Sequence, residues 1–301
     1  MLQECLRLLA QARSRSDRSV YVDATFGAGG HTVALLEAQP DAVVIALDAD
    51  PQAVARAKEL AHKFPGRLVT RQANFADLDD VLDRSGIDRV DGILYDLGIS
   101  SLQLADAQRG FSFAGDEPLD MRLDPASEAP TAANLLATLP QRDLERILLE
   151  YGDERHARAI ARSIVRRRSK VSTWRTGDLV AAVLSAHGAR HRRRIHPATR
   201  TFQALRMAVN DDLRALEGSL HTAMRRLHPH GRMVVISFHS GEDRVVKRCF
   251  KSFERQHLAR GLTRKPMRPS AAEVAANARS RSAKLRAIEA VGSPDETRGE
   301  Q

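Results

Sequence analysis

The run Ala42–Leu47 constrains the fold more than any other feature of this 301-residue sequence. Its residues are all apolar, and it lies between two segments with helical periodicity. A strand this apolar must be covered on both faces, whereas a strand with one face in water alternates apolar and polar residues. The run therefore predicts a buried strand of a parallel sheet that has helices on both sides.

Further strand candidates recur along the chain, at 20–23, 67–72, 90–95 and 232–238. The first three alternate with helical segments, which favours an α/β fold with a doubly wound sheet. Between them and the last strand the pattern is loop-like and then helical. We therefore predict an α/β domain in two parts, 1–105 and 199–301, with an inserted all-α domain at 106–198.

Two local predictions concern the second part of this α/β domain. Residues 199–226 have the pattern of one long helix. After the strand at 232–238, Ser240 and Asp243 have the spacing of a capping box for a helix over 244–253.

The charge of the chain points to a polyanionic partner. There are 47 Lys and Arg against 38 Asp and Glu, a net charge of +9. From Arg155 to Arg200 there are 13 basic residues and a single acid, Asp178. Such a local surplus of arginine favours phosphate, with nucleic acid as the leading candidate. The alternatives are a solvated basic helix face and, less favoured because no strongly apolar face accompanies it, a membrane surface.

Cysteine and histidine usage excludes several classes of site. Cys5 and Cys249 are far apart and form no C-x-x-C motif, which excludes a disulfide framework and a thiolate zinc cluster. His196, His221, His228 and His230 lack the spacing of metal ligands, so we predict no metal. No apolar run is long enough to span a membrane, and the first residues do not form a signal peptide, so we expect a cytoplasmic protein without a membrane partner.

The segment Asp23–His31 carries the strongest chemical signal. An acid closes the first strand, and Gly27, Gly29 and Gly30 let the backbone turn closely around a ligand at a helix N-terminus. Asp48 closes the next strand, where a carboxylate can accept hydrogen bonds from ribose hydroxyls. The pattern predicts a nucleoside-containing ligand; the alternative is a glycine turn without a ligand.

Two ligand classes compete for this site. A dinucleotide fingerprint needs Gly or Ala at position 32, where this chain has Thr32. The acid before the glycines and the adjacent Gly29 and Gly30 are more similar to the S-adenosylmethionine (SAM) site of class I methyltransferases. A dinucleotide-dependent oxidoreductase is therefore the disfavoured rival.

A second polar cluster, Tyr95–Gln103, follows the fourth strand. Open α/β sheets place their chemistry at the carboxyl ends of their strands. In many amino-methylating enzymes an acidic or amide side chain here accepts a hydrogen bond from the target amine. Asp96 suits that role, and Ser100 is the second candidate catalytic residue. The alternative interpretation of Asp96 is a helix N-cap.

With these motifs the chain resembles the bacterial 16S ribosomal RNA cytosine-N(4)-methyltransferases (the RsmH/MraW family). The resemblance runs through ordered blocks over nearly the whole chain, among them 23–31, 48–51, 96–104, 109–113, 118–122, 151–154, 196–206, 237–243 and 279–286. One departure is at the start, where only Leu2-Gln3-Glu4 stands for the family's His-x-Pro-Val-Leu-Leu segment.

The resemblance implies a SAM-dependent enzyme that methylates the exocyclic amine N4 of a cytidine in 16S ribosomal RNA, near the decoding centre. It also implies a Rossmann-like class I fold. By this resemblance the methionine portion of SAM is contacted by Gly29, Gly30 and His31, the ribose by Asp48 and the adenine by Phe75. Asp96 and Gln103 complete the cofactor site. Phe75 follows the third strand, a position from which an apolar side chain can contact a purine. The alternative is that Phe75 is an ordinary core residue.

The same resemblance assigns the substrate side. The partner is 16S ribosomal RNA or the assembled small subunit, and a homodimer is compatible with the sequence. The candidate RNA-binding residues are Arg166, Arg167, Arg168, Arg194, His196, Arg200 and Arg206. The alternatives are a base methyltransferase acting on another RNA or on DNA, and a noncatalytic RNA-binding protein.

Overall fold

The computed structural model describes residues 1–10, 18–187 and 196–292. The chain forms two compact units, Met1–Ile99 with Leu213–Gln301, and Ser100–Asp212. The predicted division at 105/106 and 198/199 stays a prediction. The second unit is longer than the predicted insertion at both ends. At its C-terminal end this is because the helix at 199–210 packs against helices of that unit.

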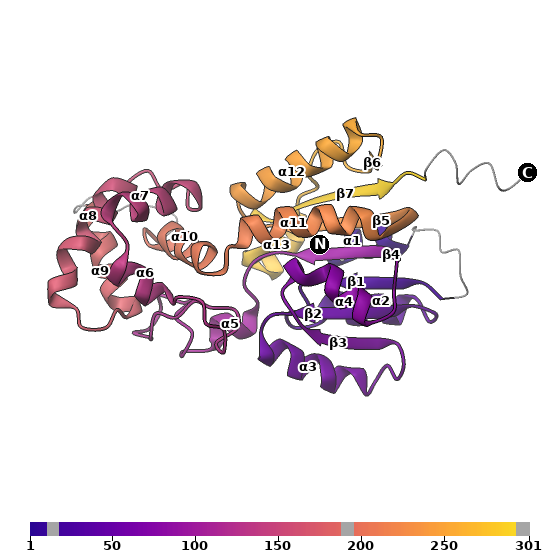
Figure 1. Ribbon diagram of the computed structural model, residues 1–301, viewed down its shortest axis with the longest axis horizontal. Coiled ribbons are helices and arrows are strands. Elements are labelled where there is room, and N and C mark those ends of the chain that lie inside the picture. Colours follow the sequence, from indigo (N-terminus) through magenta and orange to yellow (C-terminus); the bar gives the residue numbers. More distant parts are fainter. Residues whose placement is uncertain (11–17, 188–195, 293–301) are drawn as a thin grey trace, which may run out of the picture. The chain divides into compact units, whose positions relative to one another are not determined.

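The first unit contains a seven-stranded sheet, shown in Figure 1. Its strands are β1 (Val20–Asp23), β2 (Val43–Asp48), β3 (Leu68–Gln72), β4 (Val90–Asp96), β5 (Leu227–Ser237), β6 (Ala259–Gly261) and β7 (Lys284–Ala290). The order is β3-β2-β1-β4-β5-β7-β6, in which β1 to β5 are parallel and β7 is antiparallel to both β5 and β6. The predicted α/β fold class with a doubly wound sheet is confirmed.

Helices cover both faces of this sheet because successive strand side chains point to opposite faces. The helices are α1 (Leu2–Ala10), α2 (Gly30–Ala38), α3 (Pro51–Ala61), α4 (Leu78–Arg84), α11 (Asp212–Arg226), α12 (Ser240–Arg255) and α13 (Ala271–Ala276), with 3-10 turns η1 (Phe75–Asp77) and η3 (Ala278–Ser282). Val22, Ile45 and Tyr95 belong to the core under α4, α11 and α12. Tyr21 and Val44 belong to the core under α1, α2 and α3.

The second unit is helical in the part that the structure describes. Its helices are α5 (Ser101–Ala105), α6 (Ala132–Thr138), α7 (Gln141–Glu150), α8 (Ala157–Arg167), α9 (Thr176–His187) and α10 (Thr199–Asn210), with the 3-10 turn η2 (Arg168–Lys170). The arginines of α8 alternate with Ile160, Ala161 and Ile164, which are buried against the neighbouring helices. No helix in the described ranges of either unit is long and apolar enough to cross a membrane.

The prediction of one long helix over 199–226 is wrong. Asp211 has a φ of 49°, in the left-handed region, and it separates α10 from α11. The side chain of Asn210 stabilises this break, because its Nδ2 donates to the carbonyl of Met121 and its Oδ1 accepts from the amide of Leu123. Periodicity alone does not detect a break that a distant loop stabilises.

The predicted capping box at Ser240 and Asp243 is also wrong. The N-cap of α12 is His239, whose Nδ1 accepts hydrogen bonds from the amides of Gly241 and Glu242. Asp243 instead binds Lys284 and Arg286 of β7, at 3.0 and 2.7 Å. The helix therefore begins four residues earlier than predicted, at Ser240.

Candidate active site

Three aspartates end three adjacent parallel strands of the first unit. Asp23 closes β1, Asp48 closes β2 and Asp96 closes β4. Since β1 lies between β2 and β4, their carboxyl ends meet at one edge of the sheet. The chain order reverses at this point, and such a switch point is where open α/β sheets bind ligands.

The glycine turn after β1 requires one of its glycines for steric reasons. Gly29 is the N-cap of α2 and has a φ of +83°. A Cβ at this position would lie 2.5 Å from Cζ of Phe26, whereas a Cβ on Gly30 would meet nothing within 4 Å. Gly29 therefore sets the backbone of the turn, and the free amides of the first turn of α2 remain available to a ligand.

Asp23 stabilises this turn through hydrogen bonds with residues on both sides of the glycines. Its Oδ2 accepts a hydrogen bond of 2.6 Å from the hydroxyl of Thr32, and its Oδ1 accepts one from the amide of Thr25. Both Asp23 and Thr32 are buried, and burial raises the pKa of Asp23. Thr32, at the third position of the dinucleotide fingerprint, is thus an internal partner of Asp23.

Asp48 is built to accept hydrogen bonds. Its Oδ2 accepts one of 2.7 Å from the amide of Gly27, and its Oδ1 accepts one of 2.9 Å from the amide of Asp50. Burial raises the pKa of Asp48, while these amides act in the opposite direction. A carboxylate has about four acceptor positions, so the half-buried Asp48 retains capacity for ribose hydroxyls.

Phe75 begins the 3-10 turn after β3 and is half-buried. Its ring packs edge-on against Tyr95, with the ring centroids 6.0 Å apart. The hydroxyl of Ser219 on α11 donates to the Phe75 carbonyl at 2.7 Å and also pairs with the hydroxyl of Tyr95 at 2.7 Å. Tyr95 is fully buried, so it does not hold a substrate base, whereas Phe75 is only half-buried.

Asp96 and His31 form the chemical centre of the edge. Their Oδ2 and Nδ1 atoms are 3.4 Å apart. The hydroxyl of Thr25 accepts the amide of Asp96 at 2.6 Å, which holds the end of β4 in place. Burial raises the pKa of Asp96 to about 7, the charge of Glu242 also raises it, and burial lowers the pKa of His31.

Each of these two side chains has one enclosed atom that lacks a partner. Neither Oδ1 of Asp96 nor Nε2 of His31 has a hydrogen-bond partner within the described residues. Unsatisfied buried polar atoms are costly, and native proteins keep few of them. With the close backbone approach at Gly29 and the acceptors of Asp48, these atoms fit a nucleoside ligand that carries further polar groups.

The sequence interpretation missed a pair of residues after β5. Nε2 of His239 lies 2.7 Å from Oε1 of the buried Glu242, and Oε2 of Glu242 accepts from the amide of Phe238. The ring of Phe238 lies 3.4 Å from the position of a Cβ on Gly98. The sequence signal for this pair is a His and a Glu that follow an apolar strand. The three-residue spacing of His239 and Glu242 is, however, also typical of ordinary helix capping. The ring of Phe238 therefore lies beside Gly98, two residues after Asp96.

Ser100 and Gln103 lie in the second unit, where they bind each other. Ser100 Oγ accepts the amide of Gln103 at 3.2 Å, and Gln103 Oε1 accepts the amide of Ser100 at 3.0 Å. This capping box begins α5. The cap of α5 is therefore Ser100, and the N-cap interpretation of Asp96 does not apply.

The candidate RNA-binding residues of the second unit fall into two groups. Arg166, His196 and Arg200 are exposed, and the ring of His196 stacks on Phe113 at a centroid distance of 4.6 Å. Arg200 donates to the carbonyl of Asp153 at 2.9 Å. These side chains are accessible to a phosphate backbone.

The second group is used within the protein. Arg167 donates to the carbonyl of Ala181, and Arg168 donates to the carbonyls of Leu136 and Leu139. Arg206 is buried, and its Nε lies 3.2 Å from Oδ2 of Asp212. The guanidinium of Arg206 is therefore not accessible to RNA, so its assignment as an RNA-binding residue is not supported. Arg194 lies outside the described residues.

The family model and the similar sequences indicate the same family. The model of the MraW methylase family matches residues 1–291. A protein of Thermomicrobium roseum named ribosomal RNA small subunit methyltransferase H is 49% identical over 91% of this chain and 89% of its own length. One of the same name from Syntrophobacter fumaroxidans is 45% identical over 98% of this chain and 96% of its own length. A solved rRNA methylase of Streptococcus thermophilus aligns with 97% of this chain and 96% of its own, with a TM-score of 0.47 and 12% identity.

Proposed function

Because the chain belongs to the MraW methylase family, we propose that it is a SAM-dependent methyltransferase of 16S ribosomal RNA. The proposed target is the exocyclic amine N4 of a cytidine near the decoding centre. The match to the family over residues 1–291 carries the proposal, together with relatives named for the small ribosomal subunit. The protein then works where ribosomes are modified, in the cytoplasm.

The residues of the first unit suit SAM. Asp48 would accept the ribose hydroxyls, Phe75 would lie against the adenine, and the backbone at Gly29 and Gly30 with His31 would face the methionine portion. When bound, SAM supplies an electrophilic methyl group on a sulfonium. The partnerless Nε2 of His31 and Oδ1 of Asp96 are the atoms that such a ligand or its substrate would satisfy.

Asp96 is the proposed catalytic residue. The amine of cytosine is a weak nucleophile because its lone pair is delocalised into the base. An ionised Asp96 accepts a hydrogen bond from this amine and takes the proton that leaves when the N–CH₃ bond forms. A pKa of about 7 makes the carboxylate basic enough for that proton while it remains partly ionised at neutral pH. No covalent intermediate is required, and the base must leave any stack to reach this edge.

Ser100 and Gln103 have a supporting role in this proposal. They begin α5, four and seven residues after Asp96, and shape the loop that follows β4. The exposed arginines of the second unit, such as Arg166 and Arg200, would bind RNA phosphates. Either 16S ribosomal RNA or the assembled small subunit is the partner. A homodimer stays a prediction, and light scattering of the purified protein would test it.

The test is direct methylation of defined substrates. Purified protein, methyl-labelled SAM, and either 16S ribosomal RNA or small subunits from a strain lacking this protein are combined. Digestion and mass spectrometry should then detect N4-methylcytidine at one position. The Asp96→Asn variant serves as the control. Label in another RNA or in DNA would favour the alternative of a different base methyltransferase, and methyl transfer to a carbon of the base would overturn the proposed chemistry.

A further inference from the structure

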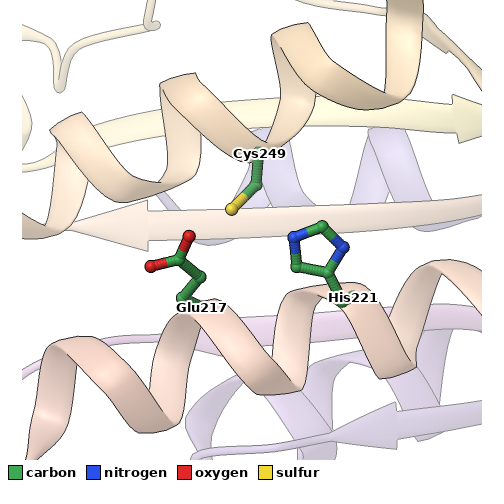
Figure 2. Close-up of side chains that lie close together, drawn as sticks. All are labelled: Glu217, His221 and Cys249. Carbon is green, nitrogen blue, oxygen red and sulfur yellow. The ribbon is translucent and has the colours of Figure 1, made fainter. Parts of the chain in front are cut away.

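A cluster of three potential metal ligands lies away from the aspartates of the sheet edge. Glu217 and His221 are on α11, and Cys249 is on α12. One carboxylate oxygen, one imidazole nitrogen and the thiol sulfur all lie within 4.8 Å of one another. Figure 2 shows the three side chains pointing toward one another from the two helices. From this geometry we propose that the cluster is a binding site for a zinc ion.

The two helices present these side chains for a simple reason. Glu217 and His221 are four residues apart, so they lie on the same face of α11, one turn after another. Cys249 projects from α12 across from them (Figure 2). The rings of His221 and Phe253 pack at an interplanar angle of 85° with their centroids 5.0 Å apart, which restricts the orientation of the imidazole. Ligands on two packed helices need only small rotamer changes to enclose an ion.

The donor set selects the kind of ion. Zinc takes cysteine sulfur, histidine nitrogen and carboxylate oxygen, with metal–ligand distances of about 2.0–2.3 Å. In a tetrahedral zinc site, neighbouring ligand atoms therefore lie roughly 3.3–3.7 Å apart. The three ligand atoms here lie within 4.8 Å of one another, so they need to move only slightly closer together. Magnesium and calcium require oxygen ligands and are excluded by the thiol. Three protein ligands leave the fourth position of zinc to water.

The burial of the three side chains suits a site that an ion can enter from solvent. Cys249 is buried and His221 is exposed, so the cluster has an entry from solvent and an enclosed end. Arg248 binds Oε2 of Glu217 at 2.6 Å, which leaves Oε1 to serve as the ligand. On zinc binding the thiol proton passes to solvent.

The residues have competing internal roles that the test must distinguish from zinc binding. Cys249 also belongs to the core under α11 and α12, where a thiol behaves as a small apolar side chain. In the sequence, Cys249 is 28 residues from His221, with no metal motif at either. Only the pairing of α11 with α12 brings them together, so the prediction of no metal followed from spacing alone.

Zinc binding to the purified, metal-stripped full-length chain tests the proposal. Competition with a chromogenic chelator should give one zinc per chain. Cobalt in place of zinc should produce a thiolate-to-cobalt charge-transfer absorption. Cys249→Ser should abolish that absorption and weaken zinc binding by at least about 100-fold, and His221→Ala and Glu217→Gln should also weaken it. Zinc should raise the Tm of the parent and not that of Cys249→Ser.

Matched variants make the result specific. Cys5 is the other buried thiol, so Cys5→Ser should keep the cobalt absorption. His156 and His187 form a histidine pair in the second unit, 4.4 Å between centroids, and His156→Ala should keep the zinc. The proposal is overturned if no stoichiometric zinc binds, or if binding survives in both His221→Ala and Cys249→Ser. Loss of zinc in His156→Ala instead would likewise overturn it. His221 is exposed, so its variant should fold even if Cys249→Ser does not.

Discussion

The Nδ1 atom of His31 lies 3.4 Å from Oδ2 of Asp96 at the carboxyl edge of the sheet. Burial moves the two pKa values in opposite directions: it raises that of Asp96 to about 7 and lowers that of His31. Near neutral pH His31 is therefore uncharged and Asp96 is divided between its acid and its carboxylate. A neutral imidazole does not hold the carboxylate in an ion pair, so Asp96 remains available to a substrate amine.

Replacement of Asp96 by Asn should slow methyl transfer on the order of 100-fold or more, because the amide keeps the size but cannot accept a proton. Interactions made mainly in the transition state appear in kcat rather than in ligand affinity. SAM affinity, measured by calorimetry, should change much less. Single-turnover rates at saturating SAM check the prediction: recovery of the parental rate there would make Asp96 only a cofactor ligand.

The rate should also rise with pH through the titration of Asp96. Its pKa is raised to about 7 by burial, so the carboxylate that accepts the proton is scarce at pH 5.5 and dominant at pH 8.5. The methylation rate of the parent should increase by about one log unit per pH unit well below the pKa and then reach a plateau. Asp96→Asn should show no such rise. A flat profile for the parent would contradict the assignment of Asp96 as proton acceptor.

The same raised pKa has a consequence for stability. Asp96 is harder to ionise in the folded chain than in the unfolded chain, so its ionisation disfavours folding. The cost is absent below the ordinary aspartate pKa, grows as the pH rises to about 7 and is constant above it. Asp96→Asn should therefore increase the free energy of unfolding more at pH 8 than at pH 4. Urea unfolding at the two pH values measures the difference, and equal effects would contradict it.

The parallel sheet was predictable from sequence because its signals are local. A run such as Ala42–Leu47 requires two covered faces wherever it occurs, and the acids and glycines at the strand ends mark one edge of the sheet. The break at Asp211 was not predictable, since the bonds of Asn210 to Met121 and Leu123 cross about 90 residues. Local signals thus identify elements, whereas long-range hydrogen bonds decide where they end.

The same distinction applies to individual site residues. The places of Asp48 and Asp96 at the sheet edge were predictable, because each residue ends a strand. The roles of Arg168 and Arg206 were not predictable, because an arginine that donates to backbone carbonyls or pairs with a carboxylate within the protein has the same sequence pattern as one that binds phosphate. The interaction of His239 with Glu242 also needs the geometry of the loop after β5.

Replacement of Asp48 by Ala should weaken SAM binding by roughly 1.5–3 kcal/mol, through loss of the acceptor for ribose. It also removes the acceptor for the amides of Gly27 and Asp50, so the glycine turn should loosen. Asp41→Ala, at an exposed site just before β2, is the matched control and should bind SAM normally. Calorimetry measures both; an unchanged affinity in Asp48→Ala would refute the role of Asp48.

The two neighbouring glycines should respond differently to alanine. Gly29→Ala places a Cβ 2.5 Å from Phe26 at a φ of +83°, and should lower the free energy of unfolding by roughly 1–3 kcal/mol. Gly30→Ala meets no atom within 4 Å and stands in the first turn of α2, so its cost should stay below about 0.5 kcal/mol. Urea unfolding compares the two. Equal effects would show that the turn tolerates a side chain at Gly29.

Substitution of the exposed arginines of α8 should weaken RNA binding, whereas substitution of the arginines that donate to backbone carbonyls within the second unit should mainly reduce stability. Arg162 and Arg166 are exposed, so reversing their charge to Glu should weaken RNA binding and leave the fold intact. The slope of log affinity against log salt should also become shallower, by about 0.7 for each phosphate of single-stranded RNA that the variant no longer neutralises.

Arg168→Ala is the contrasting variant. It leaves the carbonyls of Leu136 and Leu139 without their donor, which should cost roughly 1–3 kcal/mol of unfolding free energy. Because this guanidinium donates to two backbone carbonyls within the unit, the salt dependence of RNA binding should stay near that of the parent. Filter binding at several salt concentrations and urea unfolding distinguish the two classes. If Arg162→Glu with Arg166→Glu leaves RNA affinity unchanged while Arg168→Ala alters the salt slope, α8 contacts RNA through a different face or not at all.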